Sequence, residues 1–441
     1  MDNMKDTQIV IKRFCFTLGG FFLMCMSLWS ETAFKNDICV PSKLYMLSGV
    51  ENRVYVEAIL KRWRPYNDFV RFSGTCTFSE KLHRVASVKK PENGTYMLVD
   101  LVNSDNFQVI KEDSVTICVG KKGSGSDKVT VQILGDSFVN GAFFKEALLT
   151  QSNVPGIEMV GLRNVLGVEN QYDEGRGGWT VKKYFEIPKG GYTSYHGYMQ
   201  PEGDMRYWGD CIFWQNCFRV KNGEIKDWNK VYDCSRYDRC LEYFDEQTGF
   251  LLHPRKNDLM YDSALQSYMI YDGKQWVKTI IDEDSWKFNY GKYLEMWKLE
   301  APQFFGQMLG LNDFRDSLSA DYTSWNERIA EMKESYYKAV PKGKFMILIP
   351  CSTCGSLDNV RGDFTLRQNA AMWQLRKNII DTFDNRESEG YYLVDVGITI
   401  DNENGYRMNN EGLQVGNPHP YPNYPTMGIP IAAFIQYFRG R

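Results

Sequence analysis

Five short apolar segments, separated by helix-like patterns, constrain the fold of this chain more than any other feature. In chain order they are VTVQIL, GIEMVG, QFFGQML, KFMILIP and YYLVDV, and amphipathic patterns occupy 141–150, 324–339 and 364–383. Strands that alternate with helices form a mostly parallel sheet whose two faces are both covered by helices. We therefore expect an α/β domain over 129–441, with a five-stranded sheet in a three-layer α/β/α arrangement.

Residues 38–120 show a different pattern. Short β-type runs such as DFVRFS, TYMLVDLV and SVTICV follow one another between turns, without a helix-length amphipathic run. This pattern predicts a small antiparallel β-sandwich domain. The Gly/Ser-rich, charged segment 121–128 is typical of a linker. Residues 187–300 fit the strand–helix alternation poorly, so we expect a large insertion between the second and third strands of the sheet.

The N-terminus has the layout of a secretory signal peptide. Lys12 and Arg13 precede the apolar run 14–29, which small and polar residues follow. We predict a signal peptide over 1–30, with cleavage after Ser30 or Ala33. An uncleaved anchor is the alternative, but the run is short for crossing a bilayer. The mature protein is expected to be exported, to the periplasm or the exterior, without stable membrane insertion.

The bulk composition is that of an ordinary folded protein. Hydrophobic residues make up 43% and charged residues 24% of the 441 residues. The net charge of -3 gives no electrostatic footprint for nucleic acid. The sequence does not predict an oligomeric state.

Four cysteines, Cys211, Cys217, Cys234 and Cys240, lie close together in the predicted insertion. Because disulfides are stable in exported proteins, we expect two disulfides here. A zinc site is the alternative, although zinc ligand pairs usually have shorter spacings. The CSTC motif at 351–354 is expected to be a local disulfide or two free thiols rather than a redox pair.

Gly135-Asp136-Ser137 stands where the first strand gives way to a helix. A serine at a helix N-terminus is either a cap or a nucleophile whose developing oxyanion faces free backbone N–H groups. Capping is the commoner role of such a serine. A position directly after a strand of a parallel sheet favours function, since these sheets hold their sites at the carboxyl ends of strands.

Three further loops that follow strands carry groups that serine hydrolysis needs, namely a base and oxyanion donors. Asn312 directly follows the third strand, and the pair Gly177-Gly178 exposes backbone N–H groups after the second. His419 follows the last strand, whereas His83 lies in the predicted sandwich and the other two histidines are in or beside the insertion. Each loop alone also has a simple structural explanation as turn chemistry or an exposed histidine.

The order of these groups resembles the SGNH (GDSL-type) hydrolase superfamily over residues 128–441, through GDS, EGRGGWT, GLND and HP. The resemblance implies a flavodoxin-like fold in which Ser137 is the nucleophile and His419 the base. It also implies an oxyanion hole made of Ser137 N–H, Gly178 N–H and the Asn312 side chain, with Gly177 as a fallback for Gly178. The chemistry of this family uses no metal or cofactor.

One position departs from the family pattern. The family usually has an aspartate three residues before the histidine, and here that residue is Gly416. Asn417 cannot supply a negative charge, so we expect a Ser–His dyad in which a backbone carbonyl orients the imidazole. Weak activity, or an acid that comes from elsewhere, are the alternatives. Asp136 is expected to support the nucleophile turn.

A looser resemblance links the sandwich and hydrolase combination to exported polysaccharide-processing esterases of gut-type Bacteroidetes. It implies an acylated carbohydrate as the substrate, most simply with O-acetyl groups. Trp179 and the six tryptophans of the insertion are expected either to form walls that stack on sugar rings or to belong to the hydrophobic core. The six insertion tryptophans are Trp208, Trp214, Trp228, Trp276, Trp286 and Trp297. Two other functions stay open, a lipase or thioesterase with the same site, and a non-catalytic glycan-binding surface protein on a degenerate hydrolase fold.

Overall fold

The computed structural model describes residues 36–61, 67–81, 84–122, 127–140, 156–164, 171–190, 194–352, 367–402, 404–406, 419–420 and 424–439. The predicted signal peptide, half of the predicted linker (123–126), the predicted helix 141–150 and Gly416 lie outside these residues. Within the described ranges, no helix combines the length and the apolar character needed to cross a membrane.

The five predicted apolar segments all form strands of one sheet. They are β8 (Val129–Gly135), β9 (Ile157–Met159), β18 (Phe304–Met308), β19 (Lys344–Ile349) and β20 (Tyr391–Asp395). These strands pair in parallel in the order β9-β8-β18-β19-β20. This is the second-first-third-fourth-fifth order of flavodoxin-like sheets.

Two short strands that the sequence patterns do not predict complete the sheet. The strand β11 (Tyr172–Gly175) pairs in parallel with the end of β8, beyond the residues that β9 covers. The strand β10 (Arg163–Asn164) pairs antiparallel with β11 and makes an edge of the sheet. The chain is therefore mixed α/β, with one antiparallel edge on a parallel sheet.

Helices follow the strands of this sheet. The prediction of helices at 324–339 and 364–383 is confirmed by α9 (Thr323–Ala339) and α10 (Arg367–Phe383). The C-terminal helix is α11 (Tyr424–Arg439). The helices α3 (Ser137–Asn140) and α8 (Leu311–Phe314) begin at the carboxyl ends of β8 and β18. One hydrophobic core joins the sheet, α9, α10, α11 and the insertion.

The N-terminal region contains two sheets that share one hydrophobic core. The first sheet contains β1 (Lys43–Leu47), β7 (Val109–Gly120), β6 (Tyr96–Asn103) and β3 (Asp68–Gly74), in that order. The second contains β2 (Asn52–Tyr55), β5 (Val85–Val88) and β4 (Ser79–Lys81).

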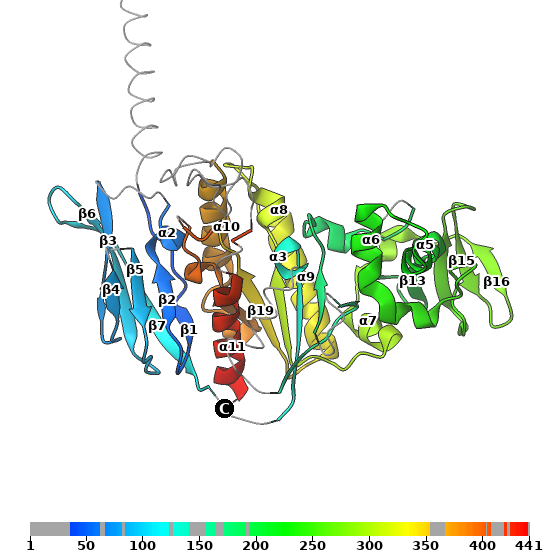
Figure 1. Ribbon diagram of the computed structural model, residues 1–441, viewed down its shortest axis with the longest axis horizontal. Coiled ribbons are helices and arrows are strands. Elements are labelled where there is room, and N and C mark those ends of the chain that lie inside the picture. Colours follow the sequence, from blue (N-terminus) through cyan, green and yellow to red (C-terminus); the bar gives the residue numbers. More distant parts are fainter. Residues whose placement is uncertain are drawn as a thin grey trace, which may run out of the picture.

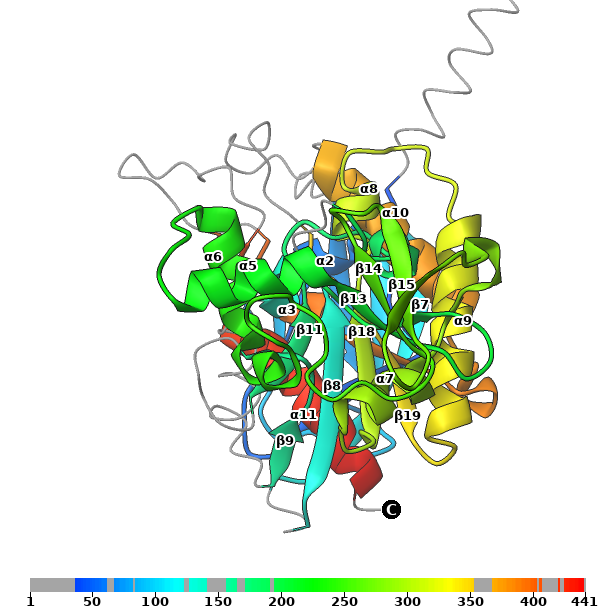
Figure 2. The ribbon, with the colours of Figure 1, turned by 90° about the vertical axis from the view of Figure 1, so that its right-hand side faces the viewer.

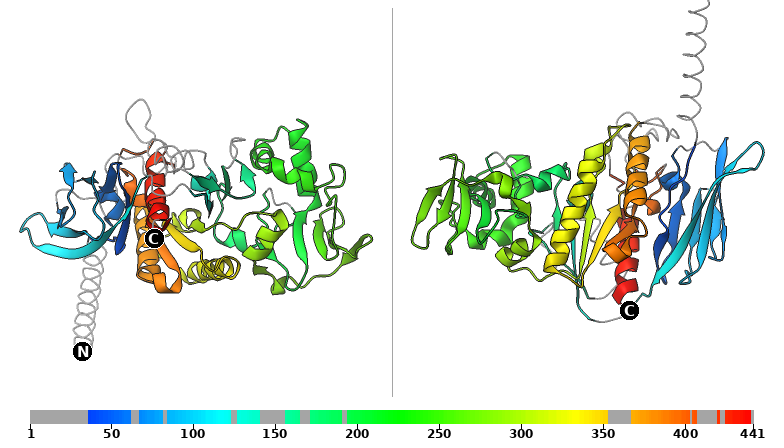
Figure 3. Two further views of the ribbon diagram at one scale, coloured as in Figure 1. Left: turned by 90° about the horizontal axis from the view of Figure 1, so that it is seen from below. Right: turned by 180° about the vertical axis from the view of Figure 1, so that it is seen from behind.

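Two features of this region differ from the expected antiparallel pattern. The strand β1 pairs parallel to β7, and the segment after β2 turns into a short helix, α2 (Val56–Ile59). Both sheets lie at one end of the molecule, with α11 between them and the central sheet (Figure 1, Figure 3). The Tyr45 ring lies 4.8 Å from the Phe434 ring, so the two regions share a packed interface.

The insertion lies at the opposite end of the long axis (Figure 1). Its main sheet contains β13 (Arg206–Asp210), β14 (Asp258–Asp262), β15 (Ser267–Tyr271) and β16 (Trp276–Thr279), and a smaller pair joins β12 (Met199–Gln200) to β17 (Lys287–Phe288). Its helices are α5 (Cys211–Lys221), α6 (Trp228–Cys234) and α7 (Tyr290–Trp297), with a 3-10 segment η3 (Ser235–Tyr243).

The prediction of two disulfides in this insertion is wrong. Cys217 and Cys234 form a disulfide that joins α5 to α6, whereas Cys211 and Cys240 are buried free thiols. A spacing of six residues in a helix turns two side chains to different faces, so Cys211 and Cys217 cannot both face α6. The disulfide also rules out a zinc site made of all four thiolates.

Candidate active site

Ser137 is the first residue of α3, directly beyond the buried strand β8. The helix is capped by Asp136, whose Oδ1 accepts the N–H of Phe138 at 3.0 Å. A helix needs one such side-chain acceptor at this position, and Asp136 supplies it. Asp136 therefore fills the capping role, and Ser137 is not needed as the cap of this helix.

Helix α3, which carries Ser137 and is called the nucleophile helix below, packs directly on the ends of β8 and β11. A Cβ atom on Gly175 would overlap the backbone of Asn140, and one on Gly135 would overlap the Val139 side chain. The N–H of Arg176 donates to the carbonyl of Gly135 at 2.9 Å. These close approaches require glycine at both strand ends. They also bring the turn at 176–179, which contains Gly177 and Gly178 and which we call the glycine turn, alongside α3.

The glycine turn is held by the buried side chain of Arg176, whereas the space next to Gly178 is open. Arg176 is fully buried, and its guanidinium pairs with Glu174 at 2.8 Å and donates to the carbonyl of Tyr195. Gly178 has φ +76°, and a Cβ atom placed on it would meet nothing within 4 Å. The left-handed backbone favours glycine here, and the space over Gly178 is open to an approaching substrate.

Asn312, in α8, joins the glycine turn to the nucleophile turn. Its Nδ2 donates to the carbonyl of Trp179 at 3.1 Å and to Asp136 Oδ2 at 3.3 Å. The next residue, Asp313, accepts the N–H of Val181 at 3.0 Å. The three predicted segments that carry Ser137, Gly178 and Asn312 are thus brought together in the structure.

The loop after the last strand also reaches the nucleophile helix. The centre of the His419 ring lies 5.4 Å from the centre of the Phe138 ring, in an edge-on geometry. Phe138 is the residue next to Ser137. Burial, together with the smaller effect of the positive charge of Arg315, lowers the pKa of His419 to about 4. Gly416 and Asn417 lie outside the described residues, so the orientation of the imidazole by a backbone carbonyl stays a prediction.

The acidic groups of this site are poorly solvated. Burial raises the pKa of Asp136 to about 7 and that of Asp313 to about 6, while hydrogen bonds from backbone N–H groups oppose both shifts. Arg315 favours the ionised form of Asp136 as well as the neutral form of His419. Arg315 was not among the predicted site residues, although it lies three residues after Asn312 in the same segment beyond β18.

The other described histidines lie elsewhere. His196 is fully buried, its Nδ1 accepts the N–H of Tyr198 at 3.2 Å, and its Nε2 lies 3.0 Å from the carbonyl of Glu186. Satisfied on both nitrogens, His196 is a core residue. His253 is exposed on the insertion, and His83 lies outside the described residues.

Most of these tryptophans belong to the hydrophobic core and do not form walls of a sugar-binding site. Trp179 is 6% exposed and lies against Arg176, with 5.2 Å between the guanidinium and the ring centre. Four insertion tryptophans are also buried: Trp208, Trp214, Trp286 and Trp297. The sugar-wall interpretation is wrong for these five rings, because buried rings present no face to a ligand. Trp276 is half-buried, and Trp228 alone of the set is exposed.

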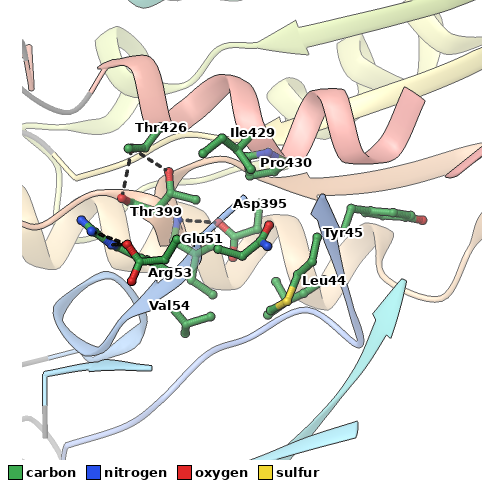
Figure 4. Close-up of a pocket in the computed structure, with 13 residues that line it drawn as sticks. Leu44, Tyr45, Glu51, Arg53, Val54, Asp395, Thr399, Thr426, Ile429 and Pro430 are labelled. Atoms are coloured by element: carbon green, nitrogen blue, oxygen red, sulfur yellow. Dashed lines mark hydrogen bonds and ion pairs between the residues drawn. The ribbon is translucent and has the colours of Figure 1, made fainter. Parts of the chain in front are cut away.

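A separate cavity of about 180 Å³ lies where β1 and β2 meet α11 and the segment after β20 (Figure 4). Its polar lining groups are already engaged. Thr426 Oγ1 lies 3.2 Å from the carbonyl of Thr399, Glu51 pairs with Arg53, and Asp395 holds Arg376 at 3.0 Å. We interpret this cavity as part of the interface between the N-terminal sheets and the α/β region.

Among the residues that the structure describes, no group of three or more histidine, cysteine, aspartate or glutamate side chains is arranged to hold a metal ion.

No family model and no curated protein sequence matches this chain. Solved structures that resemble it include a mutant acetyl esterase crystallised with an acetate ion, at 12% identity and a TM-score of 0.31, with 68% of this chain and 93% of that one covered. Another is a carbohydrate esterase family 3 protein from Talaromyces cellulolyticus, at 12% identity and a TM-score of 0.32, with 70% and 98% covered. Similarity of this size does not transfer a function from one protein to another.

Proposed function

We propose that this chain is a serine esterase of the SGNH type, in which Ser137 attacks an ester carbonyl and His419 accepts its proton. The observation that carries this proposal is the convergence of four segments far apart in the chain. Asn312 bonds both the nucleophile turn and the glycine turn, and His419 packs on the residue next to Ser137. The strand order of the sheet supports a three-layer, flavodoxin-like domain of this family.

The oxyanion of the tetrahedral intermediate would form at the N-terminus of α3. Its donors are the N–H groups of Ser137 and Gly178 and one Nδ2 proton of Asn312. That proton is the one now directed at Asp136, because its 3.3 Å bond is the longer and weaker of the two. An oxyanion is a stronger acceptor than a buried carboxyl group that is partly protonated near neutral pH.

Proton transfer would proceed in two halves. His419 takes the proton of Ser137 as the Oγ–carbon bond forms, then gives it to the leaving alcohol as the ester bond breaks. Water then attacks the acyl-enzyme in the same way and releases the acid and Ser137. A buried imidazole with a pKa of about 4 is neutral between pH 5 and 8, so it is ready to accept the proton throughout this range.

We further propose that the substrate is an O-acetylated carbohydrate outside the cytoplasm and that residues 1–30 are a signal peptide. The EGRGGWT block, which is similar to the EGHSGWT form of carbohydrate esterases, supports this substrate class. The disulfide between Cys217 and Cys234 is consistent with an oxidising compartment.

A fluorophosphonate probe and two aryl esters test the proposal. We expect the probe to label the wild type and the Ser319→Ala control, an exposed serine elsewhere, and not Ser137→Ala or His419→Ala. We expect kcat/KM for 4-nitrophenyl acetate to exceed that for the octanoate. Equal labelling of Ser137→Ala, or no labelling of wild type, would overturn the esterase and favour a binding protein. Faster octanoate hydrolysis would favour a lipase or thioesterase.

A further inference from the structure

Trp228 is an unusual residue within the insertion. It is the first residue of α6 and is 72% exposed, whereas four other insertion tryptophans are at most 6% exposed. Among the tryptophans that the structure describes, it is the most exposed. Its sequence neighbours Asp227 and Asn229 are polar and exposed, so the indole is an exposed apolar group in a polar stretch of the chain.

Trp228 begins a row of three side chains on one side of the chain, spaced four residues apart. Its ring lies 5.7 Å from the ring of Tyr232, with 30° between the planes. The guanidinium of Arg236 lies 4.1 Å from the centre of the Tyr232 ring. Residues four apart are neighbours on a helix surface, and we call this row the Trp228–Arg236 ladder.

The ladder ends on the nucleophile helix. The Tyr232 hydroxyl accepts a hydrogen bond from Asn140 Nδ2 at 2.7 Å, and Arg236 donates to the Asn140 carbonyl at 2.7 Å. Asn140 belongs to α3, which begins at Ser137. The exposed ring is therefore connected, through one tyrosine and one asparagine, to the helix that carries the nucleophile. Figure 2 shows where the two helices, α6 and α3, lie in the molecule.

The ladder is also held rigidly. The disulfide between Cys217 and Cys234 fixes the end of α6 to α5. Arg163, fully buried, pairs with Asp233 of α6 at 2.8 Å and donates to Asn140 Oδ1 at 3.1 Å. A ring fixed in place before binding loses little conformational entropy when a ligand stacks on it.

We propose that Trp228 is a stacking platform for a sugar ring of the substrate, adjoining the sugar whose ester is cleaved. This inference rests on the proposed carbohydrate esterase function. An indole face offers a flat apolar surface that matches the C–H face of a pyranose. A lipid surface or a stable protein partner needs a wider apolar patch than a single ring among polar neighbours, whereas one ring suits one sugar unit.

Trp228→Ala tests this platform through dependence on chain length. The substrates are acetylated xylose, glucose and mannose monomers, the corresponding acetylated hexasaccharides, and 4-nitrophenyl acetate. We expect the ratio of kcat/KM for the preferred hexasaccharide to that for its monomer to fall about tenfold, mainly through KM. Trp228→Phe should keep most of the ratio. Phe107→Ala removes another exposed ring, 70% exposed on the N-terminal sheets, and should change neither rate.

The outcomes separate the platform from the esterase. An unchanged ratio in Trp228→Ala, or a wild type that cleaves monomers and hexasaccharides equally well, would overturn the platform and leave the esterase standing. A wild type that cleaves the aryl acetate but none of the hexasaccharides would also overturn the platform. Hydrolysis that persists in Ser137→Ala would instead overturn the esterase itself.

Discussion

The two regions that meet at the nucleophile helix are built by different means. On the sheet side, short loops after strands position Ser137, Gly178 and Asn312 mainly through backbone groups and close glycine contacts. On the insertion side, side chains far apart in sequence make the contacts: Tyr232 bonds Asn140 of the same helix, and the buried Arg163 and Arg176 reach from the sheet region to Asp233 and Tyr237. Local geometry therefore places the reactive groups, while long-range side-chain contacts fix the surface around them.

The largest effect on stability is expected where these long-range side-chain contacts are most buried. Arg176→Met leaves Glu174 as an unpaired charge in a site with no solvent exposure. We expect the free energy of unfolding to fall by about 3–5 kcal/mol, measured by urea denaturation. Arg176→Met combined with Glu174→Gln should lose less, because no unpaired charge is left behind.

A surface pair gives the control for this experiment. Arg219 and Glu224 are more than half exposed and lie 3.4 Å apart, so Arg219→Met should cost under about 1 kcal/mol. Equal losses in Arg176→Met and Arg219→Met would show that the buried network does not hold the glycine turn, and the contrast between the two regions would disappear.

The largest kinetic effect short of losing the nucleophile is expected on the sheet side. Asn312→Ala removes one oxyanion donor, so we expect kcat for 4-nitrophenyl acetate to fall by about 10²–10³-fold with little change in KM. The variant also loses the bonds to Asp136 and Trp179, so its melting temperature is measured in parallel. A fall of less than tenfold in a folded variant would remove Asn312 from the oxyanion hole.

The same contrast explains what the sequence could predict. Local sequence patterns predict the strands, the helices α9 and α10, and the loops with Ser137, Gly178 and Asn312. The periodicity of apolar residues and the residues at strand ends can both be read from positions adjacent in the sequence. The strand β11 was missed because its residues, Tyr172–Gly175, include two acids whose burial depends on Arg176 and on distant partners. The roles of Trp214 as core and Trp228 as surface depend on tertiary packing, which a count of tryptophans does not contain.

A smaller effect is expected from the contact that joins the two regions. Tyr232→Phe leaves Asn140 Nδ2 without its 2.7 Å acceptor, and we expect a loss of about 1 kcal/mol in the free energy of unfolding. Tyr96→Phe, on an exposed ring of the N-terminal sheet, should change it by less than about 0.5 kcal/mol. If the two variants are equally stable, the ladder does not brace the nucleophile helix.

The smallest effect concerns the pH dependence of the base. The acid limb of kcat/KM reports the pKa of His419 in the free enzyme, about 4, because only the neutral imidazole accepts the proton of Ser137. Arg315→Gln removes a positive charge that disfavours the imidazolium, so the pKa of His419 rises and the acid limb moves to higher pH. The larger cause, burial, remains, so the shift is partial and the pKa stays below the ordinary value. Arg315→Lys keeps the charge and should keep the limb in place.

Arg315 also lowers the pKa of Asp136, so the pH profile alone could follow either group. An NMR titration of the imidazole C–H signals separates them, with the His419 signal assigned by its loss in His419→Ala. We expect this signal to titrate at higher pH in Arg315→Gln than in wild type. An unmoved signal with a shifted rate profile would assign the acid limb to Asp136 and place the pH control in the nucleophile turn rather than in the last loop.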